Sequence, residues 1–474
     1  MPFRERPSCF RNFSHEILYV SVISCAQLLT QAVLGNVLVP LHIIGPAINI
    51  NDNNKLPWTL AAYSLTVGIF ILITGRLGDV FGHKLLLIIG YIILAVFSLL
   101  PGMAAYVKDD IYFDVMRALQ GIGPATLLPN AVALLARAYP NCKRKSFVFS
   151  MFGATAPIAF IMGALFRSIF AELVWWPWAQ WVLAIFCVIL AILAFFRYSN
   201  GIITSGSSRS VLVIGVFALI EMKTEEPIMP PSIWTVAGFP GVLACIALGW
   251  SSFGVFMYYV VQMLQVIRGV SPLLTTAMLS PIILSGRAAT ILVSLLYGRV
   301  PAHYLLLASM CFFCIGNTLI ATLPIDQTYW AQVFVSTLLT PFGMDISFPA
   351  ASLIVSNTVP IKQQGVAASM VNTVINWSIS LGLGIAGTVE SEMIKKGMST
   401  LEGYRCALYA GIGLTGMGII VALVFCLTAS KPSPLKQEQS SDVTAAPAIS
   451  SIVTSAPVIK DNEAIIEFPM TCRL

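Results

Sequence analysis

Charged residues are scarce in this chain of 474 residues. They make up 10% of the sequence, whereas hydrophobic residues make up 57%, and an average soluble domain is about 25% charged. This composition excludes an ordinary soluble protein, and it excludes a disordered chain because disorder needs low hydrophobicity. The net charge of +6 is too diffuse for nucleic-acid binding. The composition therefore predicts repeated spans of a lipid bilayer.

Signatures of catalysis and of bound cofactors are also missing. The ten cysteines are scattered and indicate no disulfide framework. The sequence has no nucleophile–base pairing, no metal-ligand spacing and no glycine-rich phosphate-binding loop. We therefore expect neither an enzyme nor a cofactor or metal site, and we do not expect transport driven by ATP.

Twelve apolar runs are candidates for membrane spans, which need about 20 residues each. The first six cover residues 17–48, 59–74, 85–106, 111–136, 146–170 and 178–196, and the last six cover residues 236–262, 273–296, 304–323, 329–355, 366–389 and 406–428. The apolar piece Val211–Ile220 lies between the two groups. It would reach only about 15 Å as a helix, half of a bilayer core, so we expect it not to cross.

These runs predict an all-α membrane protein with two six-helix bundles. The N-terminal bundle covers residues 17–196 and the C-terminal bundle residues 236–428, joined by a cytoplasmic linker at residues 197–235. Residues 1–16 form a cytoplasmic N-terminus. The tail at residues 429–474 is rich in Ser, Ala and Pro, which predicts disorder.

The placement of basic residues predicts the orientation, because cytoplasmic loops carry an excess of Lys and Arg. With both termini in the cytoplasm, 18 of the 27 basic residues lie on inner segments and seven lie on outer loops, where Arg167, near the end of the fifth run, is counted with the loop that follows. Only Arg117 and Arg287 then fall inside spans. We therefore expect both termini in the cytoplasm.

A short segment between the second and third runs, residues 75–84, has the sequence GRLGDVFGHK. Its glycines allow a tight turn and close helix packing, and Asp79 can bind the helix-end amides of a neighbouring span. A turn that holds two helices in one of two arrangements acts as a conformational latch; the alternative is a plain charged turn. The latch motif consists of Gly75, Leu77, Asp79, Gly82 and Lys84.

A second motif lies in the fourth run and combines Arg117, Gln120 and Gly121. Arg117 and Gln120 are three residues apart, so they share one helix face. An arginine inside a span costs ~3 kcal/mol, so it should face a cavity or a partner such as Asp114. The alternative is an arginine whose side chain reaches the outer interface.

Residues 75–84 and 117–125 resemble two signature motifs of the major facilitator superfamily, the G-x-L-x-D-x-x-G-x-K loop and the R-x-x-Q-G-x-G motif of the fourth span. Residues 27–45, 63–84 and 363–369 are similar to fungal drug:proton antiporters of the type that confers aminotriazole or boron resistance. The resemblance implies two bundles that work by alternating access, and proton-driven export of small toxic compounds.

The sequence departs from this family pattern in several places. The extra helices that such antiporters usually have between their halves are reduced to residues 197–235. Val80 and His83 stand where the family prefers basic residues, and Gln31 stands where many relatives carry a titratable aspartate. The antiporter motif of span five, G-P-x-x-G-G, is represented only by Ala156, Pro157, Phe160, Ile161 and Gly163.

Asp345, in the tenth run, is the predicted proton site, because a buried carboxylate can bind and release a proton. Arg287, midway along the eighth run, is the cation that could pair with it. The alternatives are a purely structural Asp345–Arg287 pair, or a capping aspartate beside a kink at Pro341.

Amide side chains inside the first and eleventh runs are candidate substrate contacts, and two pairs of them, Gln27 with Gln31 and Asn372 with Asn376, lie four residues apart on a helix. Hydrogen bonding between helices is the alternative role for each of them. These candidates are Gln27, Gln31, Asn36, Asn372 and Asn376.

Together these features predict a secondary transporter that exports a small toxic compound or a secondary metabolite in exchange for protons. The alternative is a facilitator or importer of a small polar solute such as ammonium or borate on the same fold. A sensor without net flux is a third class, and the disordered tail argues against it. We expect a monomer in the plasma membrane, with the vacuolar membrane as the alternative.

Overall fold

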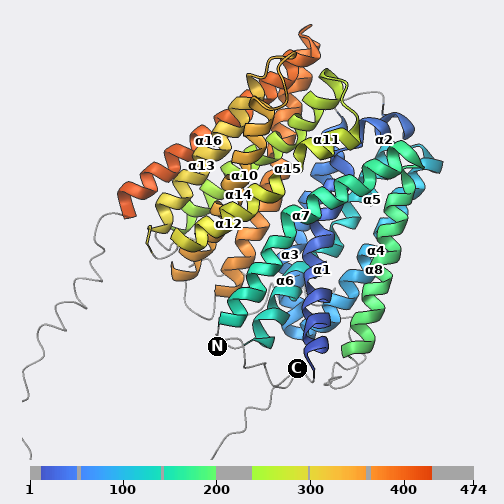
Figure 1. The fold of residues 1–474 in the computed structure, drawn as a ribbon, viewed down its shortest axis with the longest axis vertical. Coiled ribbons are helices and arrows are strands. Elements are labelled where there is room, and N and C mark those ends of the chain that lie inside the picture. The colour runs from blue at the N-terminus through green and yellow to red at the C-terminus, as the bar shows by residue number, and fades with distance from the viewer. Residues whose placement is uncertain are drawn as a thin grey trace, which may run out of the picture.

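The computed structural model describes residues 12–50, 55–139, 143–198, 238–296, 299–358 and 364–429. Long helices dominate these ranges (Figure 1). The apolar piece Val211–Ile220 and the tail after Ala429 lie outside the described residues.

Twelve stretches of the described residues are long and apolar enough to cross a membrane, which confirms the predicted number. In the N-terminal half they are formed by α1 (Phe13–Leu38), α3 (Leu56–Phe81), α4 (His83–Val107), α5 (Asp110–Gln120) with α6 (Ile122–Ala138), α7 (Lys143–Leu173) and α8 (Pro177–Tyr198), and a short α2 (Leu41–Ala47) follows α1. In the C-terminal half they are formed by α10 (Phe239–Gln262) with the π-helical η3 (Met263–Ile267), α11 (Pro272–Leu279) with α12 (Ile282–Leu296), α13 (Ala302–Ala321), α14 (Gln332–Thr358), α15 (Gln364–Lys395) and α16 (Thr400–Ala429). The two halves lie side by side as two bundles (Figure 1).

Local sequence explains where several helices begin. Pro57 and Pro272 occupy the first turns of α3 and α11, where a missing backbone N–H costs nothing. Asp109 caps α5 by accepting a hydrogen bond from Ile111 N, and Ser271 caps α11 by accepting one from Leu274 N. Polar residues between the apolar runs thus fix the ends of the spans.

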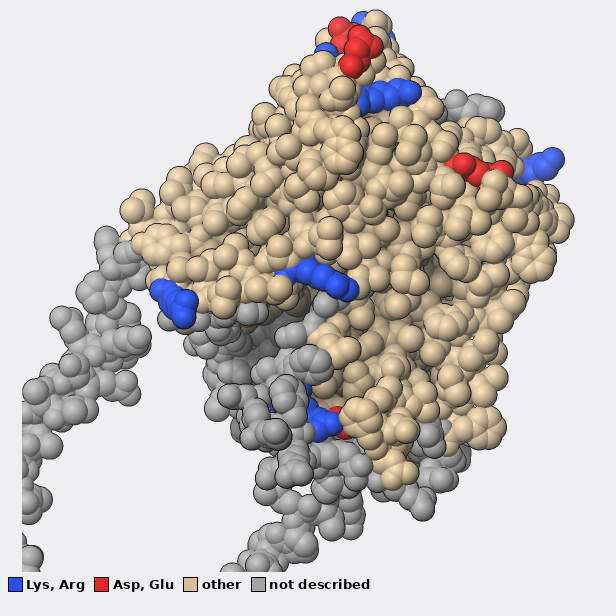
Figure 2. Space-filling model, viewed as in Figure 1, with Lys and Arg blue, Asp and Glu red and all other residues tan. Residues whose placement is uncertain are grey.

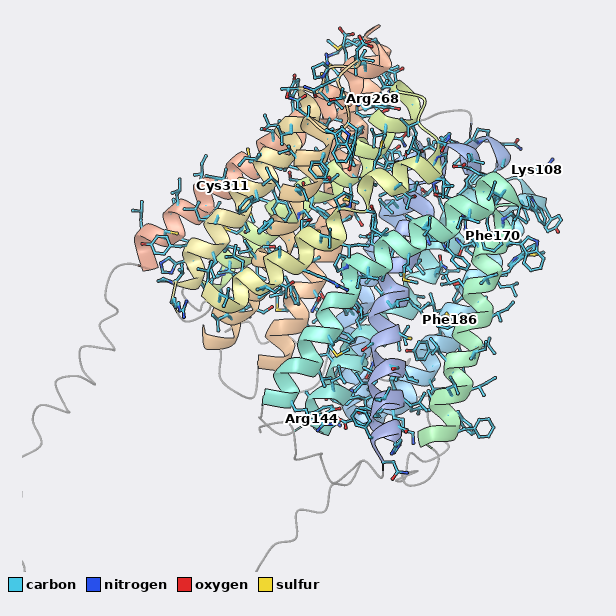
Figure 3. The ribbon with its side chains drawn as sticks, in the orientation of Figure 1. Lys108, Arg144, Phe170, Phe186, Arg268 and Cys311 are labelled. Carbon is cyan, nitrogen blue, oxygen red and sulfur yellow. The ribbon has the colours of Figure 1, made fainter. Side chains whose placement is uncertain are left out.

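The outer surface of the molecule is apolar, as expected of a protein surrounded by lipid. Leu284 and Leu427 are both 71% exposed, and the face drawn in Figure 2 is overwhelmingly uncharged. Phe186 and Cys311, labelled in Figure 3, lie on this surface between the two ends. An apolar surface of this extent requires contact with other apolar matter.

The molecule has two ends, which we name by the residues that mark them. The Gly82 end holds the turn between α3 and α4, and the Pro57 end holds the start of α3. In Figure 3, Arg144 lies toward the Gly82 end, whereas Lys108 and Arg268 lie near the Pro57 end.

Two sequence expectations need correction. Arg167, assigned to an outer loop, lies within α7 and is fully buried, with its guanidinium stacked on the ring of Trp176. The segment 75–84 was expected to be a loop, but α3 continues to Phe81 and α4 begins at His83. Gly82 is therefore the only residue between the two helices.

Candidate functional site

The two bundles meet through α3 and α15. Ser380 Oγ on α15 donates a hydrogen bond of 2.8 Å to the Ala61 carbonyl on α3. The glycines at this contact show how closely the two helices approach. If Gly68 carried a methyl group, as alanine does, that group would lie 3.0 Å from Trp377 N, and a methyl group on Gly387 would lie 3.4 Å from the Pro57 ring. These contacts all lie in the half of α3 that is nearer the Pro57 end.

A second contact between the bundles joins α7 to α11 and α12. The hydroxyls of Ser168 and Thr276 are 3.2 Å apart, and Glu172 Oε1 accepts a hydrogen bond of 2.6 Å from Leu273 N. Since Pro272 starts α11 at the Pro57 end, these bonds also close the molecule at that end. The structure is thus a state in which the bundles are joined at the Pro57 end.

The cross-bundle contact of α3 borders a cavity of about 290 Å³. This volume falls at the lower limit for small-molecule pockets. Its lining includes Trp58 of α3 and Thr388 of α15. The cavity therefore lies at the closed end of the bundle interface.

The latch motif at the opposite end requires its glycines. Gly82 has φ +98° and ψ 125°, a backbone conformation that is strained for other residues. A methyl group on Gly78 would lie 1.9 Å from Asn130 Oδ1 on α6, and one on Gly75 would lie 3.4 Å from Pro129. Leu77 and Lys84 are half-buried beside this turn. The predicted close packing is confirmed at Gly78.

His83 connects the latch to α6. Its Nδ1 lies 2.8 Å from Asn130 Oδ1 and its Nε2 lies 3.3 Å from Asp79 Oδ1. Arg137 Nη2 also reaches Asp79 Oδ1, at 3.5 Å. His83 therefore links Asp79 to Asn130 at a position where the family prefers a basic residue. Val80 is exposed and takes no part.

Arg117 and Gln120 form the centre of a buried polar cluster. Arg117 Nη1 donates to Gln120 Oε1, and its guanidinium lies 4.7 Å from the centroid of the Tyr63 ring. Gln120 Nε2 donates to Ser98 Oγ at 2.8 Å. Both Arg117 and Gln120 are fully buried, so the predicted sharing of one helix face is confirmed. Gly121 gives room for this packing, since a methyl group there would lie 2.6 Å from the Tyr63 carbonyl.

The first span packs closely on α7 through two glycines. A methyl group on Gly35 would lie 2.2 Å from the Phe160 carbonyl, and one on Gly163 would lie 2.2 Å from the Ala32 carbonyl. Gly163 thus retains a packing role although Phe160 and Ile161 replace the family's glycine pair. Asn36, the next residue along α1, is buried with no hydrogen-bond partner for Oδ1 among the described residues.

The remaining candidate amides lie along α1 and α15. Gln27 and Gln31 are half-buried. Asn376 Nδ2 donates to the Asn372 carbonyl at 2.9 Å, so part of its hydrogen-bonding capacity is used within α15. A methyl group on Gly68 would lie 3.4 Å from Asn376 Cβ, which places Asn376 at the contact between the bundles.

Asp345 does not pair with Arg287, so the predicted ion pair is wrong. A methyl group on Gly286 would lie 3.0 Å from Asp345 Oδ2 and 3.3 Å from the Pro157 ring. Gly286 therefore faces α14 and α7. The next residue is turned about 100° around the helix, and Arg287 is exposed.

Asp345 lies where three helices from both bundles meet, namely α14, α12 and α7. Its Oδ2 is buried and has no hydrogen-bond partner among the described residues. Pro157, which faces the same side of Gly286, belongs to the reduced antiporter motif of span five. Asp345 thus lies where the C-terminal bundle meets α7.

Sequence reasoning missed three buried charged residues, one of which, Glu16, is 4% exposed. Arg167 is 0% exposed and Glu390 is 1% exposed, so Glu390 is more buried than Asp345. Glu390 Oε2 accepts a hydrogen bond of 2.7 Å from Tyr259 OH. The signal for Arg167 was its position inside an apolar run, and Glu390 follows its run directly.

Comparison with known proteins decides the family. The model of the Major Facilitator Superfamily matches residues 23–383 and 288–468. The chain belongs to the Major Facilitator Superfamily. It is therefore a membrane transporter with many spans, and this class of protein acts on small molecules within a bilayer.

Three fungal members of the superfamily are similar to the chain over most of their length. A low affinity ammonium transporter of Saccharomyces cerevisiae is 42% identical, over 89% of this chain and 90% of its own. An efflux pump of Aspergillus terreus is 39% identical, over 91% and 92%. An aminotriazole resistance protein of S. cerevisiae is 30% identical, over 88% and 85%. The predicted resemblance to fungal drug-resistance transporters is thereby confirmed.

Proposed function

We propose that this transporter exports a small toxic compound or a secondary metabolite in exchange for protons, by alternating access through the plasma membrane. The observation that carries the proposal is the unpartnered Asp345 carboxyl beside Gly286 and Pro157. A proton bound there changes the charge at the contact between α14, α12 and α7. The similarity to an efflux pump supports the direction of transport.

In this proposal the Gly82 end faces the cytoplasm, as do both termini, and the bilayer surrounds a monomer. The described state, joined at the Pro57 end, then receives substrate from the cytoplasm. The candidate amides of α1 and α15 contact substrate, and Arg117, Gln120 and Gly121 belong to the cavity and its coupling to protons. The latch motif, whose Asp79 is already in contact with His83 in this state, moves toward the other bundle as the cytoplasmic end closes.

The test of proton coupling is the change Asp345→Asn, which keeps the shape of the side chain and removes its titration. In inside-out vesicles, an imposed proton gradient should drive uptake by the wild type, and the variant should lose this dependence. Asp326→Asn is the matched control, because Asp326 is exposed and the same atoms change. Equal proton dependence in wild type and Asp345→Asn would refute the assignment.

A second candidate function is import of a small polar solute, favoured by Gln31 at the family's titratable position and by the similarity to an ammonium transporter. Expression in a susceptible yeast that lacks its own exporters separates the two. Export predicts resistance to a toxicant and lower accumulation, both lost when a protonophore is added. Higher accumulation of the solute would favour import.

A further inference from the structure

Two fully buried arginines lie in the N-terminal bundle with little to neutralise them. Arg117 on α5 and Arg167 on α7 are both 0% exposed. A buried charge without a partner is strongly destabilising, so this pair demands an explanation.

Aromatic rings hold the two groups in place. The Arg167 guanidinium stacks 5.2 Å from the Trp176 ring, and Trp176 packs edge-on against Phe113, one helical turn before Arg117. The Arg117 guanidinium lies over the ring of Tyr63. Cation–π contacts stabilise the position of a guanidinium but leave its N–H groups without acceptors.

The buried polar cluster around the two arginines has many hydrogen-bond donors without an acceptor and almost no acceptors without a donor. Five buried nitrogen atoms have no hydrogen-bond partner among the described residues, namely Nη2 of Arg117, Nε, Nη1 and Nη2 of Arg167, and Nε2 of Gln180. Gln180 belongs to the cluster because its Oε1 accepts a hydrogen bond from Gln120. Only one oxygen of the group, Asp114 Oδ1, is likewise without a partner.

The charges of the cluster do not balance either. Asp114 lies three residues before Arg117, on the same face of α5, and Arg167 forms no ion pair with a described carboxylate. Even with Asp114 ionised, two cations face one anion. One further negative charge would neutralise the site.

We infer that Arg117, Arg167 and Gln180 form a binding site for a monovalent anion, either the carboxylate of a transported compound or free chloride. A guanidinium binds a carboxylate through two parallel hydrogen bonds, and Arg167 offers all three of its nitrogens. The residue after Arg167 is Ser168, which contacts Thr276 of the other bundle.

This inference deepens the proposed function, on which it rests for the claim that the site lies on a transport route. It also predicts that the site repels ammonium. Binding itself can be tested without protons or transport, so the two proposals fail separately.

The first experiment measures the midpoint temperature of thermal unfolding of the purified full-length protein. The buffer begins as sodium sulfate, and the sulfate is replaced by acetate or by chloride at constant ionic strength. At least one of the two anions should raise the midpoint in a saturable manner. Replacing sodium by ammonium should change nothing. The absence of a saturable rise with either anion would overturn the inference.

The variant Arg167→Gln should weaken binding of the anion about ten- to hundredfold, as expected when hydrogen bonds to a charged group are lost. It should also be at least as stable as the wild type when both anions are absent, because an unpaired buried charge has been removed. Arg299→Gln is the matched control, since Arg299 is exposed, and it should keep the wild-type response. An undiminished response in Arg167→Gln would refute the site.

Arg167→Lys serves if the glutamine variant does not fold. It keeps the charge but loses the planar fork, so it should bind chloride and acetate more weakly than the wild type. Unchanged binding of both anions by this variant would count against the site. Uptake of labelled benzoate or chloride into proteoliposomes then separates the two sources. Benzoate uptake that Arg167→Gln abolishes assigns the site to the substrate, and chloride binding without any anion uptake assigns it to a free ion.

Discussion

Gly163 offers a direct test of the packing between the first span and α7. A methyl group at this position would lie 2.2 Å from the Ala32 carbonyl and 2.6 Å from Ala32 Cα. These are backbone atoms of α1, which cannot rotate away as a side chain can. The change Gly163→Ala must therefore separate the two helices by about 1 Å, and overpacking of this kind costs roughly 1–3 kcal/mol.

The helical preference of alanine over glycine acts in the opposite direction, by up to about 1 kcal/mol. Gly413→Ala isolates this gain, because a methyl group at Gly413 on α16 meets no atom within 4 Å. The difference between the two variants is then the cost of separating α1 from α7. Thermal unfolding of the purified protein measures this cost. The midpoint temperature of Gly163→Ala should lie several degrees below that of Gly413→Ala.

Gly35 faces the same contact from α1, so the two glycines should not act independently. Once Gly163→Ala has moved the helices apart, Gly35→Ala should cost less than it does alone. The reasoning would be refuted if Gly163→Ala were as stable as Gly413→Ala, or if the two costs simply added.

Three further changes test the two ends of the molecule. Ser380→Ala removes the hydrogen bond to Ala61 and should weaken closure of the Pro57 end by about 1 kcal/mol. Distances measured between spin labels on residues of the Pro57 end should therefore lengthen. Thr388→Ala should leave these distances unchanged, because the Thr388 hydroxyl donates to Gly384 of its own helix. Gly82→Ala should cost about 1–3 kcal/mol in unfolding free energy from backbone strain alone, since a methyl group there meets nothing within 4 Å, and a stability equal to Gly413→Ala would contradict this. Glu16 is 4% exposed and accepts hydrogen bonds from Arg144 (2.9 Å) and Tyr139 (2.8 Å), so Glu16→Gln should lower the unfolding free energy by about 3–5 kcal/mol. Burial raises the pKa of Tyr139 well above its ordinary value, which keeps this hydroxyl a donor, and the exposed Glu392→Gln should have little effect by comparison.

The spans could be predicted from sequence because the requirement for apolar residues in lipid acts on each helix separately. The same is true of the turn at Gly82, where the local sequence alone demands a glycine. The twelve spans and the glycine turn between the second and third of them therefore followed from composition and spacing. None of these predictions needed to know which helices touch.

The errors concern how helices are rotated against one another. Asp345 and Arg287 lie in neighbouring helices, but Gly286 and not Arg287 faces Asp345, and a rotation of one residue changes the partner. Arg167 lies near the end of an apolar run, and only the position of Trp176 in the folded protein shows that its side chain turns inward. Both facts depend on tertiary packing, which a single sequence does not specify.

The dimensions of α3 have a mechanical consequence. Gly68, where α3 comes close to the backbone of α15, stands eleven residues from Pro57 at one end and eleven from Asp79 at the other, or about 16 Å in each direction. The helix is thus a lever with equal arms and its pivot at Gly68. A tilt of about 10° would move each end by about 3 Å in opposite directions over arms of this length. Because only Gly82 separates α3 from α4, the second helix must follow, so breaking the contact at Ala61 and bringing Asp79 toward the other bundle are one and the same movement.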